Sequence, residues 1–107
     1  MGGRTYICGL DAAMHAMGGK WKALILWWLQ ERPLRFGELR RTVEGISERV
    51  LILQLRELEA HGLVHRHVHE QVPPRVEYSL TDFGRSLVPA LNALGAWGEE
   101  NMDRLQG

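Results

Sequence analysis

Hydrophobic residues recur at helical spacing along the first thirty positions of the chain. Leu10, Met14 and Met17 lie three or four positions apart, with alanines between them and two glycines after them. This spacing predicts a short helix that ends at the glycine pair. Residues 21–30, WKALILWWLQ, predict a second helix that is apolar almost all round, and such a helix is buried on several sides. One face of this helix is marked by Trp21, Leu24, Ile25 and Trp28.

Two further helices, separated by a tight turn, follow Pro33, which ends the second one. Residues 36–43, FGELRRTV, form the third predicted helix, and residues 44–46 form the turn. Ser47 is a favourable N-cap for a longer helix, because its hydroxyl can accept a hydrogen bond from a free backbone N–H group. Gly62 is a favourable stop for that helix. Its inward stripe consists of Leu51, Leu55 and Leu58.

From residue 63 onward the hydrophobic pattern changes to alternation, which is typical of strands. Residues 63–69 and 76–80 predict two strands, and the loop between them contains a Pro-Pro pair that cannot lie in a central strand. Thr81 is expected to cap a last helix, in which Pro89 predicts a break near Leu87.

This order of elements predicts a mainly α (α+β) fold. Two helices joined by a three-residue turn with a glycine are typical of the helix-turn-helix, and a two-stranded wing hairpin directly after them makes it a winged helix. The length favours one domain, residues 1–107, and a hydrophobic share of 45% excludes a disordered chain. The longest apolar run, residues 23–29, is too short to cross a bilayer, and no secretory leader is recognised, so a cytoplasmic protein is expected.

Charge is unevenly distributed along a chain whose formal net charge is zero. Six arginines lie between residues 32 and 56 against three glutamates, whereas residues 99–103 carry three acids and no base. Zero net charge weighs slightly against nucleic-acid binding, but the location of a basic segment matters more than the total. The basic segment coincides with the predicted helix-turn-helix, which favours DNA binding.

Five ordered motifs carry a resemblance to a known family: CGLDAAMHAMGGKWKALIL, RFGELRR, GISERVL, QLRELEAHGLV and VPPRVEYSLTDFGRSL. The chain resembles the HxlR-type winged helix-turn-helix transcriptional regulators of bacteria, within the MarR-like class. The resemblance covers residues 8–100 and leaves residues 1–7 as an N-terminal arm. It implies a homodimer, with its first and last helices as dimerisation helices, that binds operator DNA, commonly as a repressor associated with the nucleoid. With twofold symmetry, the operator is expected to be pseudo-palindromic.

The helix that begins at Ser47 is the predicted recognition helix. An α-helix fits the major groove of B-DNA and presents its N-terminal turn to the base edges, where Arg49 is the best candidate for a bidentate contact with guanine. Ile52 and Leu53 stand where the family usually has polar residues, which leaves more of the recognition to phosphates and DNA shape. Arg56 is expected to face a base, a phosphate or a surface acid. The predicted DNA-facing residues of this helix are Ser47, Glu48, Arg49, Ile52, Leu53 and Arg56.

Phosphate contacts are expected from arginines outside that helix. Arg35, Arg40 and Arg41 lie on or before the third helix, where they can position the protein on DNA without specifying sequence. Neighbours on a helix point about 100° apart, so only one of Arg40 and Arg41 is expected to meet DNA. Pro74 and Arg75 are expected at the hairpin tip, and a cation on a stiff loop suits insertion into the minor groove. An exposed loop arginine without a partner is the alternative.

Three histidines, His65, His67 and His69, alternate along the first predicted strand and share one face. If the hairpin is symmetric about Pro73, Glu77 lies opposite His69, and a metal site of His67, His69 and Glu77 becomes the alternative to a solvated wing. The first and last of these histidines lie about 13 Å apart along a strand, too far for one ion to bind all three. The sequence contains no HExxH or CxxC motif, and the resemblance implies no metal here. Solvent-facing or phosphate-facing histidines are therefore favoured, and no metal or other cofactor is expected.

Cys8 is the only cysteine, so an internal disulfide cannot form. In some HxlR-type regulators an N-terminal cysteine senses oxidants or electrophiles, and the resemblance extends that role to Cys8. A small packed residue at the dimer interface is the alternative. A small-molecule effector is a further hypothesis, because the four tryptophans can line a pocket between subunits, although aromatics at helical spacing more often form a core.

Two other classes of function compete with a DNA-binding regulator. A winged-helix ligand- or protein-binding module without DNA recognition is slightly favoured by the zero net charge and by Ile52 and Leu53. A metal-dependent enzyme rests only on the histidine strand. The sequence has no recognisable nucleophile–base pair, paired catalytic carboxylates or phosphate-binding loop, so an enzyme is not expected.

Overall fold

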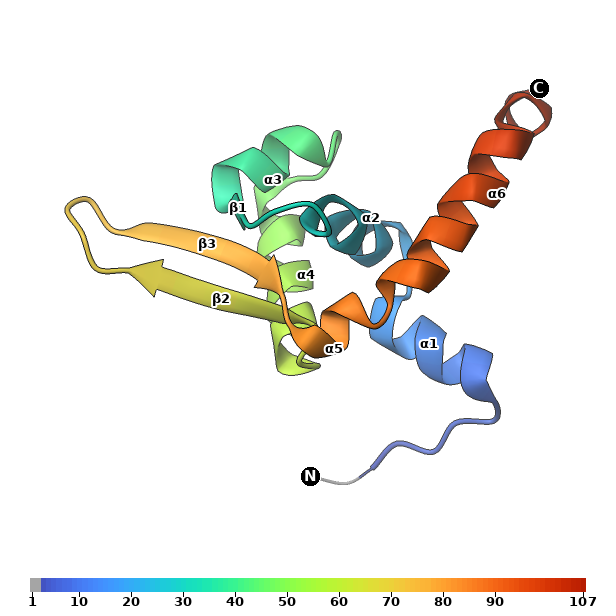
Figure 1. Ribbon diagram of the computed structural model, residues 1–107, viewed down its shortest axis with the longest axis horizontal. Helices are drawn as coiled ribbons and strands as arrows, with labels where there is room; N and C mark the ends of the chain where they lie inside the picture. Colours follow the sequence, from blue (N-terminus) through green and yellow to red (C-terminus); the bar gives the residue numbers. More distant parts are fainter. Residues whose placement is uncertain (1–2) are drawn as a thin grey trace.

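The first two predicted helices are present in the computed structural model, which describes residues 3–107 (Figure 1). α1 (Gly9–Met17) ends at the predicted glycine pair, and α2 (Lys20–Leu29) follows it directly. The predicted N-terminal arm lies ahead of α1 and has no regular secondary structure from residue 3 onward. Residues 1–2 of that arm lie outside the described residues.

The core buries only part of the α2 face that the hydrophobic spacing marks. Ile25 of that face is buried, whereas Trp28 is 41% exposed. When almost every position of a helix is apolar, the spacing of hydrophobic residues does not distinguish an inner face from an outer one. Packing against the neighbouring elements then decides which face is buried. The buried side chains of α2 are Ile25, Leu26 and Leu29.

α3 (Phe36–Thr42) and α4 (Glu48–Ala60) form the predicted helix-turn-helix. The hydroxyl of Ser47 accepts a hydrogen bond from the backbone N–H of Val50 at 3.1 Å, which confirms the N-cap. Gly62 has a φ of +75°, the left-handed conformation that commonly follows the end of a helix. The predicted inward stripe is also confirmed: the buried residues of α4 are Leu51, Leu55 and Leu58.

The sheet has three antiparallel strands in the order β1-β3-β2, where two were predicted. β2 (Val64–His69) and β3 (Arg75–Leu80) form the wing, together with the loop between them. β1 (Leu34–Arg35) pairs with the other edge of β3, and Leu34 is buried opposite Tyr78. Two residues are too few for an alternating pattern to stand out in a sequence, which is why β1 was not predicted.

The register of the wing corrects the expected arrangement of its histidine face. His69 does not lie opposite Glu77, as symmetry about Pro73 required. The Cα partner of His69 is Arg75, and that of Glu77 is His67. The hairpin is therefore centred one residue earlier than predicted, which changes every cross-strand pair by two positions.

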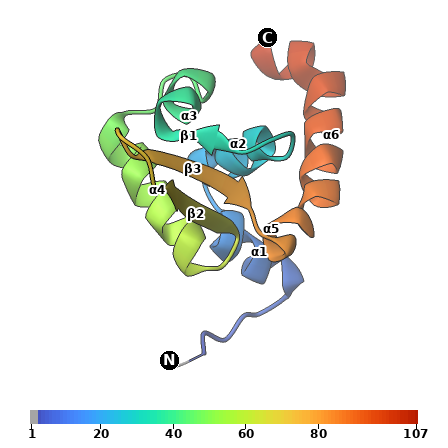
Figure 2. The same cartoon turned by 60° about the vertical axis from the view of Figure 1, so that its left-hand side comes forward.

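The C-terminal helix is broken where the proline predicts. α5 (Asp82–Arg85) and α6 (Val88–Gln106) are separated at residues 86–87, and the hydroxyl of Thr81 accepts a hydrogen bond from the N–H of Gly84 at 2.9 Å. Pro89 lies in the first turn of α6, where its missing N–H removes no helical hydrogen bond. α6 leads away from the sheet, and its C-terminal end projects from the rest of the molecule (Figures 1 and 2).

The core lies between α2, α4 and one face of the sheet, and α6 packs against α2 from another side (Figure 2). Gly95 permits that packing, because a Cβ atom there would lie 2.7 Å from the indole ring of Trp27. Among residues 3–107, no helix combines the length and the apolar character needed to cross a membrane. The largest fully buried side chains are Ile25, Leu26, Leu29, Leu39, Val43, Leu51, Leu55, Leu58, Leu63 and Val64.

Candidate nucleic-acid interface

The outer face of α4 carries charged and apolar side chains next to one another. Ile52 is 36% exposed and Leu53 is 52% exposed, so neither belongs to the core. Both line a surface hollow together with charged residues of the same helix. Apolar side chains in this place can contact thymine methyl groups but cannot pair with the donors and acceptors of base edges. The charged residues that complete this hollow are Glu48, Arg49 and Arg56.

The first turn of α4 carries one cation, Arg49, without an ion-pair partner among the described residues. Glu48 Oε2 lies 3.5 Å from Nη1 of Arg40, so the carboxylate is partly neutralised across the turn of the helix-turn-helix. Arg49 is exposed and forms no ion pair within residues 3–107. Its guanidinium is therefore available for an external acceptor, at the helix end where the backbone dipole also favours anions.

Glu38 caps the start of α3. The side chains of Arg35, just before this helix, and Arg41, near its end, lie on the surface. The backbone N–H of Arg35 donates to Oε1 of Glu38 at 2.9 Å, and Arg32 Nη1 donates to Oε2 at 3.3 Å. These bonds, above all the one from the Arg35 backbone, hold the pKa of Glu38 below its usual value. Glu38 thus stays ionised as a cap, while the side chains of Arg35 and Arg41 remain exposed.

The structure brings together three of the predicted contacts that are far apart in the sequence. Arg35, Pro74 and Arg75 all line one surface hollow between the start of α3 and the wing loop. Arg75 is the first residue of β3 and lies beside the loop, not at its tip as predicted, because the tip falls within residues 70–74. Its Nε atom is buried and has no hydrogen-bond partner within residues 3–107.

The histidine face of the wing is held by one hydrogen-bonded pair. His69 Nε2 lies 2.6 Å from Oε1 of Glu77, diagonally across the two strands. The hydrogen bond from His69 is the main reason why the pKa of Glu77 lies below its usual value. The His67 and His69 rings pack edge to face, with their centroids 4.3 Å apart. Within residues 3–107, no three side chains of the metal-binding types lie close enough to hold one ion, so the candidate set of His67, His69 and Glu77 lacks the geometry of a metal site.

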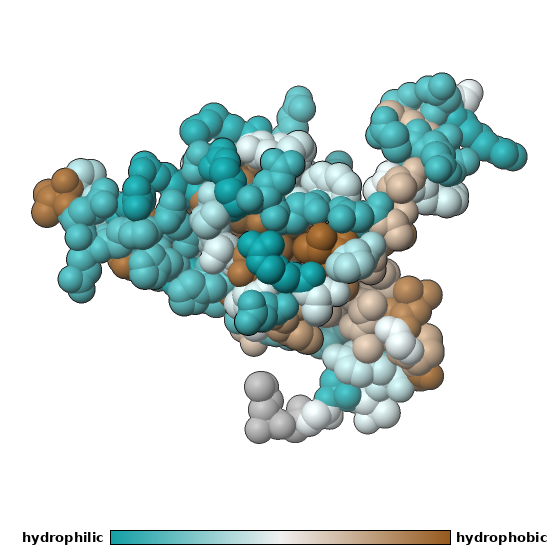
Figure 3. Space-filling model, in the orientation of Figure 1, coloured by the Kyte–Doolittle hydropathy of each residue, from teal (hydrophilic) through white to brown (hydrophobic). Residues whose placement is uncertain are grey.

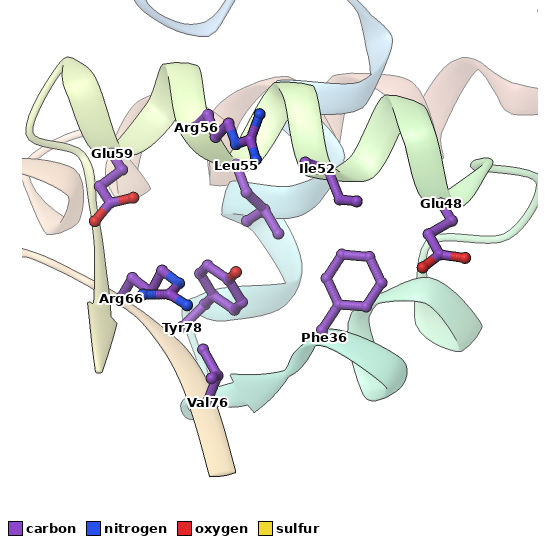
Figure 4. Close-up of a pocket in the computed structure, with 9 residues that line it drawn as sticks. All are labelled: Phe36, Glu48, Ile52, Leu55, Arg56, Glu59, Arg66, Val76 and Tyr78. Atoms are coloured by element: carbon purple, nitrogen blue, oxygen red, sulfur yellow. The ribbon is translucent and has the colours of Figure 1, made fainter. Parts of the chain in front are cut away.

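Another hollow, of about 530 Å³, lies between α4 and the wing and is shown in Figure 4. We call it the α4–wing hollow. Apolar and aromatic side chains line its inner part, and charged side chains stand around them on α4 and β2 (Figure 4). Its apolar and aromatic residues are Phe36, Ile52, Leu55, Val76 and Tyr78, and its charged residues are Glu48, Arg56, Glu59 and Arg66.

Arg66 lines this hollow, and the sequence analysis assigned no role to it. It pairs with Tyr78 in the sheet and points to the side of the sheet that faces α4, opposite to the three histidines. Strand alternation contained the signal, because every second residue of β2 shares the inner face with Val64.

The N-terminal arm contacts the C-terminal end of α4 through a chain of three rings. The hydroxyl of Tyr6 lies 2.5 Å from Nδ1 of His15, and the His15 ring meets His61, the C-cap of α4, at 5.1 Å between centroids. Partial burial, followed by the charges of Arg4, His61 and Lys22, lowers the pKa of His15. Cys8 is exposed at the N-cap position of α1, two residues after Tyr6.

Exposed apolar side chains gather on α1 and α6, away from the recognition helix. Hydrophobic residues are prominent over α1 and beside the base of α6 in Figure 3. A groove between α2 and α6 continues this surface and is lined mainly by apolar residues, including Leu24, Trp27 and Leu94. The large exposed hydrophobic residues of this region are Ile7, Leu10, Met14, Leu94, Trp97, Met102 and Leu105.

Residues 16–106 match the model of the HxlR-like helix-turn-helix family. The chain is 48% identical over 99 residues to the uncharacterized HTH-type transcriptional regulator YybR of Bacillus subtilis, an alignment that covers 92% of this chain and 79% of that protein. An uncharacterized HTH-type transcriptional regulator of Methanothermobacter thermautotrophicus is also 48% identical over 99 residues, which cover 92% of this chain and 76% of that protein.

Solved structures show the same fold. The redox regulator HypR in its reduced form superposes with a TM-score of 0.87 at 47% identity, covering 92% of this chain and 98% of that one. Diamide-treated YodB of B. subtilis superposes with a TM-score of 0.73 at 32% identity, covering 90% of this chain and 96% of that one. The arrangement of helices and wing described above is thus that of experimentally determined winged-helix regulators.

Proposed function

The chain belongs to the HxlR-like helix-turn-helix family, whose members are DNA-binding transcriptional regulators and not enzymes, and on this premise we propose how it binds its operator. We propose a homodimer that recognises a pseudo-palindromic site in double-stranded DNA, with one α4 helix in each of two major grooves. The observation that carries this proposal is the outward face of α4, which is backed by buried leucines and carries Arg49, an arginine that forms no ion pair with any of residues 3–107.

Sequence readout is assigned mainly to Arg49. A guanidinium presented near the start of a helix in the major groove can bond both acceptors of guanine, worth roughly 1–3 kcal/mol of discrimination against another base. Glu48 is partly neutralised by Arg40, which leaves both less free to contact DNA. Ser47, Ile52, Leu53 and Arg56 complete the proposed contact surface, with the two apolar side chains reading thymine methyl groups and local shape.

Positioning on the duplex is assigned to cations around α4. Arg35 and Arg41 are exposed and form no ion pair within the described part of the chain, so phosphates are suitable partners for them. Arg75 and Pro74, next to Arg35 around one hollow, are proposed to approach the adjacent minor groove. Such contacts strengthen binding to all sequences alike.

The second copy is proposed to cover the apolar surface of α1 and α6. Leu94, Trp97 and Leu105 are each more than half exposed in a single chain, and Leu10 of α1 and Ile7 just ahead of it add to this surface. An apolar surface of this kind on two helices is typical of a subunit interface. We propose that a twofold axis through this surface places the two α4 helices against one duplex.

The response to a signal is proposed to start at Cys8, and repression is the proposed outcome of operator binding. HypR is described as a redox regulator, and YodB has been solved after diamide treatment. Cys8 is exposed, and it lies beside the Tyr6–His15–His61 contact that reaches α4. Oxidation or alkylation of Cys8 would therefore act on the arm that touches the end of the recognition helix.

Selection of genomic fragments by the purified protein, followed by footprinting, tests the proposal. We expect protected half-sites of inverted symmetry, centred about 10 bp apart or a multiple of it. Binding to every fragment without an enriched motif, or to none at low salt, would contradict it. The second outcome would favour a module that kept the fold without DNA recognition.

A further inference from the structure

We propose that one strand of the bound duplex runs through the α4–wing hollow and that Arg66 holds its phosphates together with Arg56. This inference rests on the proposed function, because it assumes that α4 lies in the major groove. It adds a contact on the inner side of the wing, where the sequence analysis placed none. The ligand is a phosphodiester backbone, recognised by its charge and not by its base sequence.

The position of the hollow follows from the geometry of a duplex. One sugar-phosphate strand separates each major groove from the neighbouring minor groove. A protein with a helix in the first groove and a hairpin at the second must therefore straddle that strand. The α4–wing hollow is the space between these two elements, and Ile52 and Arg56 line both it and the hollow on the outer face of α4.

Two unpaired arginines stand on opposite sides of this space. Arg56 projects from α4 and Arg66 from β2, and both line the hollow (Figure 4). Both are exposed, and neither forms an ion pair within residues 3–107. A guanidinium matches the oxygens of a phosphate with two parallel hydrogen bonds. The apolar part of the hollow, formed by Leu55, Val76 and Tyr78 among others, can face the deoxyribose.

Two carboxylates around the hollow oppose an anionic strand. Glu48 lies 3.5 Å from Arg40, which reduces its effect. Glu59 lines the same space and has no ion-pair partner among the described residues. Without Arg66, the charges of the hollow that have no ion-pair partner within residues 3–107 would be one cation, Arg56, and one anion, Glu59, and the hollow would not attract a phosphate. This balance makes Arg66 the residue on which the proposal depends.

The test measures the affinity of full-length wild-type, Arg66→Gln and Glu59→Gln proteins for the selected operator and a scrambled duplex over about a fivefold range of KCl. Arg66→Gln should weaken both complexes by about tenfold, because a hydrogen bond to a charged group is lost. The slope of log K against log[salt] should become shallower by about 0.9, the value for one phosphate contact. Glu59→Gln should strengthen both complexes.

Matched controls separate this role from general effects. Arg104→Gln removes the same charge from α6, far from the hollow, and His65→Gln changes the neighbouring residue on the opposite face of β2. Both should keep the wild-type slope. An unchanged slope for Arg66→Gln would overturn the inference, and a lower melting temperature in that variant would instead identify Arg66 as a partner of Glu59 that fastens the wing to α4.

A second measurement uses wild-type protein and so does not depend on the folding of a variant. Methylphosphonate replaces single phosphates along the operator, and we expect the largest loss of affinity on the strand between the α4 half-site and the flanking minor groove. No loss there would overturn the inference. If wild-type protein recognises its operator and Arg49→Ala abolishes that preference, while this strand is insensitive, the proposed function stands and only the inference fails.

Discussion

The carboxylate of Glu48 lies 3.5 Å from the guanidinium of Arg40, across the turn that joins the two helices of the helix-turn-helix. Both side chains are more than half exposed, so the pair adds little to stability, between 0 and about 1 kcal/mol. Its consequence is electrostatic. It partly neutralises the acid next to Arg49, which itself has no ion-pair partner in the described part of the chain.

Arg49→Ala should therefore remove specific recognition. We expect operator affinity to fall by about 10- to 100-fold, since a bidentate arginine–guanine contact contributes roughly 1–3 kcal/mol of discrimination, while affinity for scrambled DNA falls much less. Fluorescence anisotropy on both duplexes measures the two effects. Arg104→Ala serves as the charge-matched control. Equal loss on both duplexes would mean that Arg49 contacts phosphate, and our placement of the recognition helix would then be wrong.

Trp97→Glu should convert the dimer to monomers. Trp97 is 59% exposed on α6 in the single chain, so the substitution should leave the fold intact while placing a charge in the proposed apolar interface. We expect the dimer dissociation constant to rise by about 100-fold, as for loss of a central interface residue. Sedimentation velocity gives the subunit state, with Gln71→Glu in the wing loop as the control. Wild-type protein that sediments as a monomer would refute the proposed interface.

Oxidation should change operator affinity through Cys8 alone. With one cysteine per chain, a disulfide between two copies must join their Cys8 residues: two thiols lose two electrons and two protons, and diamide takes them up. We expect diamide to shift the footprint of wild-type protein and to leave that of Cys8→Ser unchanged. Non-reducing electrophoresis distinguishes a disulfide from an adduct. An oxidant effect that persists in Cys8→Ser would place the sensor elsewhere.

Acidification should destabilise the protein through His15. Its pKa is lowered in the folded protein, mainly by partial burial and then by Arg4, so the unfolded chain takes up the proton first as the pH falls. The contribution of neutral His15 to stability is complete above about pH 6.5 and is lost as the pH falls toward the lower folded pKa.

Urea unfolding at pH values on both sides of 6.5 measures this effect. We expect His15→Gln to show a smaller decrease in stability on acidification than wild-type protein, and His65→Gln, on the exposed face of the wing, to behave like wild type. If His15→Gln loses as much stability as wild type between the two pH values, another group is responsible.

Some elements were predictable because their causes lie within a few residues of the chain. The cap at Ser47, the stop at Gly62 and the break near Leu87 each depend on a local backbone requirement that one residue type meets. The outward face of α4 followed from the leucine spacing alone. Together with the motif resemblance, these features were sufficient to predict a winged helix-turn-helix and its DNA-binding class.

Contacts between distant segments were decided by the tertiary structure. Four features depend on contacts that no sequence spacing predicts. They are the orientation of α2, the two-residue strand β1, the register that sets His67 against Glu77, and the pairing of Arg40 with Glu48. Arg66 shows the difference most clearly. Alternation assigns it to a face of β2, but only the packing of that face against α4 gives it Arg56 as a neighbour across one hollow. Periodicity constrains a residue relative to its own element, whereas its partners depend on how the elements pack.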